Sequence, residues 1–192
     1  CNDVLPYCCL DEPREPWREQ LMEICLPLVS EADSTSEAAL LLNANVWSKL
    51  GVQYQPNLSP AYTSPQSVMQ HGSASCTGLS VLLVACCRAV GVPARCCGVA
   101  DWGDGSGNHV WVEIWDREGW QHIGAAEPSE FNATWFEDRL WPSDGPRVIA
   151  STFAPSSASA KLRFPLPWQR ADESEAAVPG LDVTSAYRRV SD

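Results

Sequence analysis

The chain has 192 residues, of which 45% are hydrophobic, and its formal net charge is −11 at pH 7. This length suits one domain with a sizeable core. The acidic charge argues against partners that present phosphates, namely nucleic acids and anionic membrane surfaces. No apolar run approaches the ~20 residues that span a bilayer. We therefore expect one acidic globular domain with no nucleic-acid partner and no membrane span.

The first residue is Cys1, and neither an initiator Met nor a signal segment precedes it. We therefore expect the chain to be a processed or excised piece of a longer, multidomain chain. Its location stays open. Cys1 would suit the lipid-bearing first residue of an exported protein, whereas cysteines that remain reduced would suit the cytoplasm.

Nine cysteines are present, and six of them form the adjacent pairs Cys8-Cys9, Cys86-Cys87 and Cys96-Cys97. The spacing lacks the CxxC pattern and the histidine partners of a zinc site. We therefore predict no metal and no cofactor, and interpret most of these cysteines as small buried hydrophobic residues.

Helices dominate the first half of the sequence. Residues 1–16 are punctuated by prolines and are predicted to be irregular. From Trp17 on, apolar residues recur at helical spacing until Pro27 bends or ends the helix. A second helix fits 36–50, because "STSE" is a capping box before it and Gly51 follows it. The stretch "VQYQPNLSPAYTSP" predicts a short strand and a Pro-rich loop, and a third helix is predicted over 76–90, ended by "GVP".

The second half is typical of strands and turns. Strands are predicted at 94–102, 109–115, 119–125 and 147–154, with a short helix over 132–140 capped by Asn132. Since helices precede strands without alternation, the fold class is α+β with an antiparallel sheet. The predicted division is an irregular segment (1–16), a catalytic domain (17–152) and an extended segment or linker (153–192).

Cys76 differs from the other cysteines in its position. Ser73 or Ser75 can cap the third helix, which places Cys76 in its first turn, where unpaired N–H groups and the helix dipole stabilise a thiolate. Cys86 and Cys87 lie within the same helix and are predicted to be packing residues.

A reactive thiol needs a base, and the chain has three histidines. His71 is predicted in the loop before the Cys76 helix, and His122 on a short strand. His109 opens the strand "HVWVEIW" directly after the glycine-rich "GDGSGN", where it is well placed to face a helix that packs on the sheet.

Together these motifs resemble the transglutaminase-like superfamily, in its bacterial type. The resemblance rests on Cys76 at a helix start, "RAVGVPAR" at the end of that helix, "HVWVE" from His109 to Glu113, and the Gly119-Trp120 turn. It covers about residues 70–140. It implies a papain-like fold, in which the helix that carries the nucleophile packs on an antiparallel sheet.

The resemblance further implies a triad, with Cys76 as nucleophile, His109 as base and a carboxylate that orients the imidazole. The sequence departs from the family at the acid. Its expected position is Gly124, and the nearest acid is Glu127, a displacement that a β-bulge could absorb. Glu113 competes for the role, but it lies on the same strand face as His109, as a neighbour rather than a partner.

The oxyanion hole is expected to use the backbone N–H of Cys76 together with an upstream indole or amide. Trp47, Gln53 and Gln70 are candidates, and Trp111 is a further candidate for the substrate site. The sequence does not choose among them.

These features predict an enzyme that cleaves or transfers an amide of a peptide or protein through a thioester on Cys76. Water as acceptor would make it a peptidase or amidase, and an amine acceptor would make it a transglutaminase. Two alternatives stay open. One is an inactive binding or scaffold module of the same fold, and the other is a lyase or isomerase that uses the same pair on a small metabolite.

Overall fold

The computed structural model describes residues 3–58, 63–127, 129–153, 162–164 and 178–188. Its α-helices are α1 (Arg18–Cys25), α2 (Thr35–Leu50), α3 (Pro65–His71), α4 (Cys76–Ala89) and α5 (Glu137–Leu140). Its strands are β1 (Gln53–Tyr54), β2 (Ser73–Ala74), β3 (Ala94–Val99), β4 (His109–Asp116), β5 (Gly119–Ile123), β6 (Ile149–Ser151) and β7 (Gly180–Asp182). The α+β class is confirmed.

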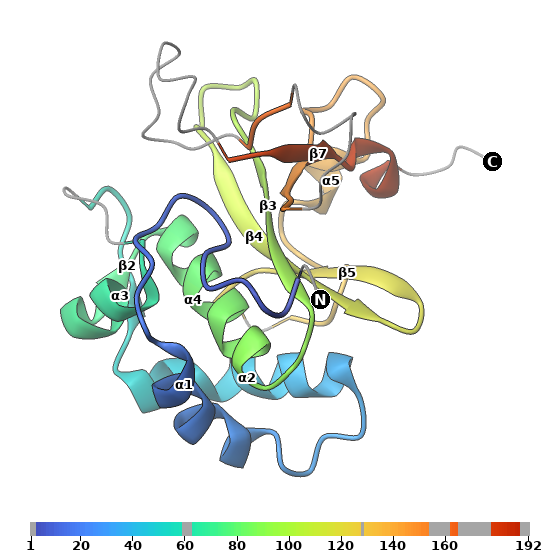
Figure 1. Cartoon of the computed structure of the whole chain (residues 1–192). Coiled ribbons are helices and arrows are strands. Elements are labelled where there is room, and N and C mark those ends of the chain that lie inside the picture. Colours follow the sequence, from blue (N-terminus) through green and yellow to red (C-terminus); the bar gives the residue numbers. More distant parts are fainter. Residues whose placement is uncertain (1–2, 59–62, 128, 154–161, 165–177, 189–192) are drawn as a thin grey trace.

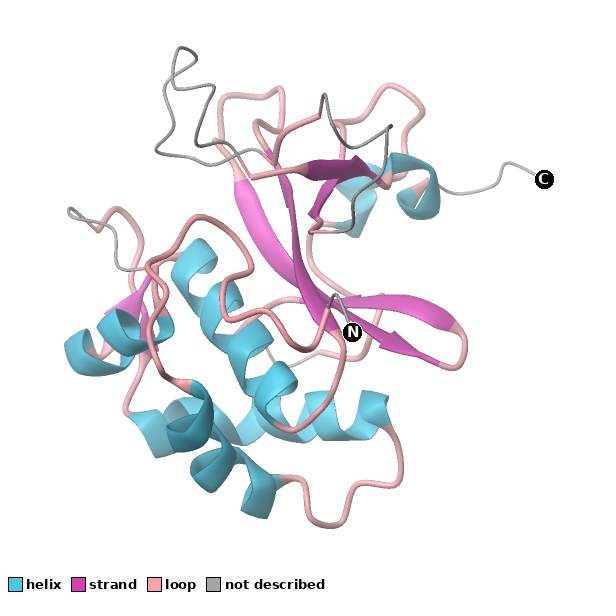
Figure 2. Ribbon diagram, in the orientation of Figure 1, coloured by secondary structure: helices cyan, strands magenta, loops and turns pink. Residues whose placement is uncertain are grey.

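The sheet that carries the site has the strand order β5-β4-β3-β6-β7, and every neighbouring pair is antiparallel. Helix α4 packs against β3 and β4, and α1, α2 and α3 pack around α4. Figures 1 and 2 show α1, α2, α3 and α4 gathered on one side of this sheet, with α4 nearest to it, while α5 lies beside β7. The predicted packing of the Cys76 helix on an antiparallel sheet is therefore confirmed.

Helix α2 has the two end signals that the sequence predicted. The Ser34 side chain accepts a hydrogen bond from the Glu37 N–H, and Gly51 ends the helix with a φ of 65°. The helix starts one residue earlier than expected, at Thr35. Helix α1 ends at Cys25, and Pro27 lies in the 3-10 turn Leu26–Leu28 that follows it.

Helix α3 was not predicted. Ser64 caps it by accepting from the Ser67 N–H, Pro65 occupies its first position, and Gly72 ends it with a φ of 74°. His71 is therefore the last residue of a helix, and its predicted place in a loop is wrong. Strand β2 follows directly and pairs in parallel with β1, which brings Tyr54 next to the start of α4.

The four strands predicted in the second half agree with the structure in place, but β3, β5 and β6 are shorter than predicted and β4 extends one residue further, to Asp116. Strand β3 ends at Val99 rather than at residue 102, and β6 covers only Ile149–Ser151. The predicted cap of the helix at 132–140 is wrong. Asn132 has a φ of 56° and its side-chain oxygen accepts from the His122 N–H, so it anchors a loop to β5, and α5 begins only at Glu137.

Some of the described residues within 153–192 join the same sheet, and Thr184–Tyr187 form a 3-10 helix that follows it. Strand β7 pairs with β6, and residue 163 forms a bridge with residue 179. At the other end of the chain, Arg88 of α4 holds the N-terminal segment by donating to the carbonyls of Asp3 and Cys8. Cys1 and the acidic run at 171–177 lie outside the described residues, and the division into three segments stays a prediction.

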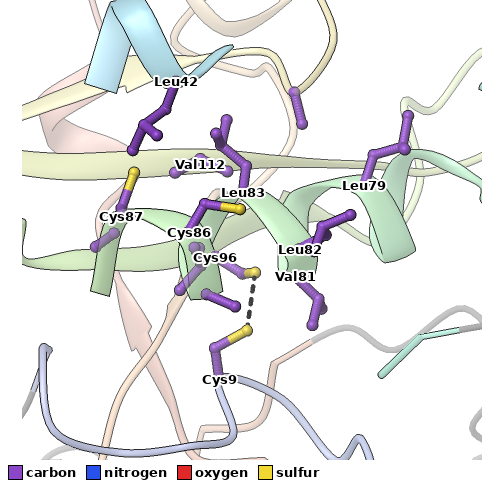
Figure 3. Packing of buried hydrophobic residues seen from close by; sticks show 14 of the residues in the cluster. Cys9, Leu42, Leu79, Val81, Leu82, Leu83, Cys86, Cys87, Cys96 and Val112 are labelled. Carbon is purple, nitrogen blue, oxygen red and sulfur yellow. Dashed lines mark hydrogen bonds between the residues drawn. The ribbon is translucent and has the colours of Figure 1, made fainter. Parts of the chain in front are cut away.

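The main core lies between the helices and the sheet. Leu79, Leu82, Leu83 and Cys86 of α4 are fully buried there with Val112 of β4 (Figure 3). Cys86 and Cys87 are both buried, as predicted, and the sulfurs of Cys9 and Cys96 face each other at 3.6 Å. Within the described residues no helix is both long and apolar enough to cross a membrane.

A second, smaller core covers the opposite face of the sheet. It contains Trp102, Trp111, Phe136 and Tyr187. Side chains alternate along β4, so Val110, Val112 and Ile114 face α4 while Trp111 belongs to this second core. By the same alternation, His109 points toward the second core.

Candidate active site

Cys76 is the first residue of α4, and Ser75 occupies the cap position without a side-chain capping bond. The thiol is largely buried. Burial raises its pKa above the ordinary value, while hydrogen bonds from the Val110 N–H and from Thr77 lower it by less. The net direction is opposite to the one expected from the helix start, because desolvation outweighs these hydrogen bonds.

His109, the first residue of β4, lies among aromatic rings. Its ring centroid is 5.1 Å from that of Phe136 and 5.2 Å from that of Trp135, and its residue is only 8% exposed. Desolvation lowers the pKa of His109 to about 4. The imidazole is therefore neutral near pH 7, as a base must be before it accepts a proton.

Cys76, His109 and Glu127 line one cavity of about 460 Å³. Its walls also include Tyr54, Trp102, Asn108, Trp135 and Arg139. A second hollow of about 500 Å³ shares Tyr54, Cys76, Ser106 and Asn108 with the first and continues to Pro56, Asn57 and Leu58. Cys76 therefore lies where two adjoining hollows meet.

Glu127 faces the imidazole across this cavity. Its Oε1 lies 3.8 Å from His109 Nε2, which is longer than a hydrogen bond, and accepts from Trp135 Nε1 at 3.1 Å. Nε2 is buried and has no hydrogen-bond partner within the described part of the chain. Burial raises the pKa of the Glu127 carboxyl, and the Trp135 hydrogen bond opposes this.

Asn43, buried on α2, holds the segment that carries Glu127. Its Nδ2 donates to the carbonyls of Gly124 and Glu127 at 2.9 and 3.1 Å, and its Oδ1 accepts from the Ala126 N–H at 2.9 Å. The Trp47 indole N–H donates to the carbonyl of Asn43 at 2.7 Å and to its Oδ1 at 3.2 Å. Asn43 thus fixes the turn after β5 from the helical side.

Glu113 has other partners. Its Oε2 accepts from Arg95 Nε at 2.7 Å, and its Oε1 accepts from the Tyr187 hydroxyl at 2.7 Å. It does not line the cavity with Cys76. His122 likewise pairs elsewhere, at 3.2 Å from Glu137, and His71 is exposed at the end of α3.

The four predicted oxyanion and substrate residues lie outside the cavity. The Trp47 indole N–H donates to the Asn43 carbonyl, and the Trp111 indole N–H donates to the Tyr187 hydroxyl in the second core. Gln53 and Gln70 are exposed on β1 and α3. None of the four lines either hollow beside Cys76.

Sequence reasoning missed Tyr54, Asn108 and Trp135, which do line the cavity. Two of them had a signal, since Tyr54 follows the predicted Gln53 on the short strand and Asn108 directly precedes His109. Tyr54 lines the cavity together with Cys76 and Glu127. Burial, followed by the charges of Cys76 and Glu127, raises the pKa of its hydroxyl. Trp135 had no local signal.

In the described ranges, no group of three or more His, Cys, Asp or Glu residues could hold a metal ion. What the chain brings together is a cysteine at a helix start, a histidine at a strand start and a carboxylate after the next strand. This arrangement on an α+β scaffold defines a papain-like fold.

The comparisons with known proteins name the family. The family model described as "Transglutaminase-like superfamily" matches residues 23–125, which is more than half of the chain, so the chain belongs to this superfamily. The match includes Cys76 and His109 and ends two residues before Glu127. A search of curated proteins found no match.

Two solved structures share the fold. A proposed cysteine protease from Cytophaga hutchinsonii has a TM-score of 0.50 and 20% identity, over 65% of this chain and 42% of that one. A proposed protease from Parabacteroides distasonis has a TM-score of 0.50 and 10% identity, over 69% of this chain and 26% of that one. The chain spans less than half the length of either structure.

Proposed function

We propose that this protein is a thiol enzyme that cleaves or transfers an amide or similar acyl group of a peptide or protein through a thioester on Cys76. One observation carries the proposal. Cys76, His109 and Glu127 come from three separate segments, the start of α4, the start of β4 and the turn after β5, and line one cavity. Membership of the superfamily supports the same chemistry.

The proposed reaction starts from a neutral pair. The pKa of Cys76 is raised and that of His109 is lowered to about 4, so a thiol and a neutral imidazole face the substrate at pH 7. Because Nε2 faces Glu127, Nδ1 is the nitrogen left to accept the thiol proton. As Sγ bonds to the carbonyl carbon, that proton moves to Nδ1, and the carboxylate stabilises the imidazolium.

His109 then returns the proton to the departing amine, the carbon–nitrogen bond breaks, and a thioester remains on Cys76. The acceptor, water or an amine, gives a proton to His109 as it attacks the thioester carbonyl carbon. The carbon–sulfur bond then breaks, and His109 returns the proton to Sγ of Cys76. Hydrolysis and transamidation share every residue named so far and differ only in this acceptor.

The two hollows favour an extended substrate. One is lined by Trp102, Trp135 and Glu127, and the other by Pro56, Asn57 and Leu58. Since Cys76 belongs to both, we propose that a peptide lies along both hollows with its reacting carbonyl over Cys76. A small metabolite, as a lyase or isomerase would use, would need only one of them.

The test is to trap the acyl-enzyme with a peptide amide library and to measure intact mass with and without an added amine. We expect one acyl adduct, lost in Cys76→Ala. The matched control is Cys8→Ala, since Cys8 is also half-buried and reduced but lies outside the cavity. Passage of the acyl group to water would indicate a hydrolase, and passage to the amine a transferase. A folded protein that forms no adduct with any peptide would support the binding module instead.

A further inference from the structure

The chain reverses direction between β5 and Glu127. The Glu127 N–H donates to the Gly124 carbonyl at 3.3 Å, and Ala126 has a φ of 61°, so 124–127 form a reverse turn. The first and fourth residues of such a turn lie within about 7 Å of each other. Residue 127 therefore returns beside residue 124 although three residues separate them.

Gly124 leaves a space that Glu127 fills. A Cβ at residue 124 would lie 3.0 Å from Cβ of Glu127, 2.5 Å from its Cδ and closer still to its Oε2. The glutamate carboxylate thus occupies the volume into which any side chain at 124 would project.

Backbone conformation does not explain why residue 124 is glycine. Ala126 and Asn132 have positive φ angles, as do seven glycines of the described chain, but Gly124 is not among them. An L-residue at 124 would therefore meet no left-handed strain. The obstacles to a side chain there are the carboxylate of Glu127 and, at 3.0 Å, its Cβ. The carboxylate is the far end of a flexible side chain, so it is the group that would be displaced.

We propose that Gly124 is a positioning residue for Glu127, because its missing side chain lets the Glu127 carboxylate fold back into the place from which it faces Nε2 of His109. The inference rests on the proposed function, in which Glu127 orients His109. Gly124 and Glu127 together then place the carboxylate that faces His109. A carboxylate carried by residue 124 itself would occupy the same volume.

The tautomer of His109 reports this geometry without any substrate. A carboxylate that faces Nε2 favours the proton on Nε2 and leaves Nδ1 as the acceptor. The imidazole is neutral at pH 7, since its pKa is about 4. With three histidines in the chain, the ¹⁵N chemical shifts of labelled His109 can be assigned by comparison with a His109→Gln variant.

The experiment compares the full chain with Gly124→Ala, Glu127→Ala and the double variant Gly124→Asp/Glu127→Ala, with Glu130→Ala as the control. Glu130 is an exposed acid three residues beyond Glu127. We expect the wild type and the control to hold the proton on Nε2. Glu127→Ala and Gly124→Ala should both give a mixture of tautomers, and the double variant should return it to Nε2. The melting temperature of each variant shows whether it is folded.

Turnover should follow the tautomer. We expect Glu127→Ala to lower kcat by on the order of 10²–10⁴-fold, as loss of the orienting acid does in triad enzymes, with little change in KM. The double variant should recover at least tenfold of that loss. A folded Gly124→Ala with the wild-type tautomer would overturn the proposal, as would a folded double variant that behaves like Glu127→Ala. If no protein in the set forms a Cys76 adduct, the proposed function fails, while the tautomers still decide the role of Gly124.

Discussion

Replacing Asn43 by Ala tests whether this buried side chain holds the turn that carries Glu127. The substitution removes three hydrogen bonds to the turn, two from Nδ2 and one to Oδ1. At about 1 kcal/mol net for each hydrogen bond, the free energy of unfolding should fall by about 3 kcal/mol. For a chain of 192 residues this corresponds to a melting temperature lower by roughly 6–12 °C.

The matched control lies on the same helix. Asn45 is exposed, and among the described residues its Nδ2 donates only to the Leu41 carbonyl one turn earlier. Asn45→Ala should therefore change the free energy of unfolding by no more than about 0.5 kcal/mol. Thermal or urea unfolding followed by circular dichroism measures both variants. In the active enzyme, Asn43→Ala should also lower kcat by roughly ten- to hundredfold, because the carboxylate loses its fixed position.

Equal melting temperatures for Asn43→Ala and Asn45→Ala would refute this account of the turn. A large loss of stability with unchanged kcat would separate the two claims. It would leave Asn43 as a stabilising residue and remove its link to Glu127.

Two further predictions concern pH and backbone strain. The pKa of His109 is about 4 in the folded protein, against an ordinary value of 6.5, so the unfolded chain binds more protons between these pH values. The contribution of His109 to the free energy of unfolding is therefore fully present above pH 6.5, and about 3 kcal/mol of it is lost as the pH falls to 4. The pKa of His122 is also lowered by burial, so the test is the difference between the wild type and His109→Gln in urea melts from pH 7 to 4, and parallel curves would contradict it. Ala126→Gly should raise the free energy of unfolding by about 0.5–1 kcal/mol. The left-handed φ of 61° strains Ala in the folded state by more than the backbone entropy that a Gly loses on folding. Ala125→Gly is its control and should destabilise, and a loss of stability in Ala126→Gly would show that the turn is unstrained there.

Local signals predicted most of the fold. The capping box at Ser34, the alternation of "HVWVEIW" and the apolar run of α4 each specify an element within a few residues. Helix α3 also had a local signal, Ser64 before Pro65, but the other prolines nearby favoured a loop. Asn132 was assigned as a cap because Asn is common there, whereas it is equally suited to the left-handed conformation it adopts.

The candidate site also contains residues that the sequence predicted and residues that it did not. The positions of Cys76 and His109 follow from the start of a helix and the start of a strand, so the sequence predicted them. The sequence also flagged Gly124 and Glu127, but it suggested a bulge where a turn closes the three-residue displacement. Tyr54 reaches the cavity through the parallel pairing of β1 with β2, and its place beside Gln53 was the one hint of this in the sequence. Trp135 reaches the cavity through ring contacts with Trp102 and Phe136 of the second core, and such long-range packing leaves no mark in the residues beside it.

The central claim is that Cys76 acts as a nucleophile with His109 as its base. The most direct measurement is the rate at which the Cys76 acyl adduct forms, by rapid-quench intact mass, in the wild type, His109→Gln and His122→Gln. We predict that His109→Gln slows the adduct by on the order of 10²–10⁴-fold, while His122→Gln, whose ring pairs with Glu137 away from the cavity, forms it at close to the wild-type rate. Equal rates in the wild type and a folded His109→Gln, or an adduct on any other cysteine, would contradict the claim.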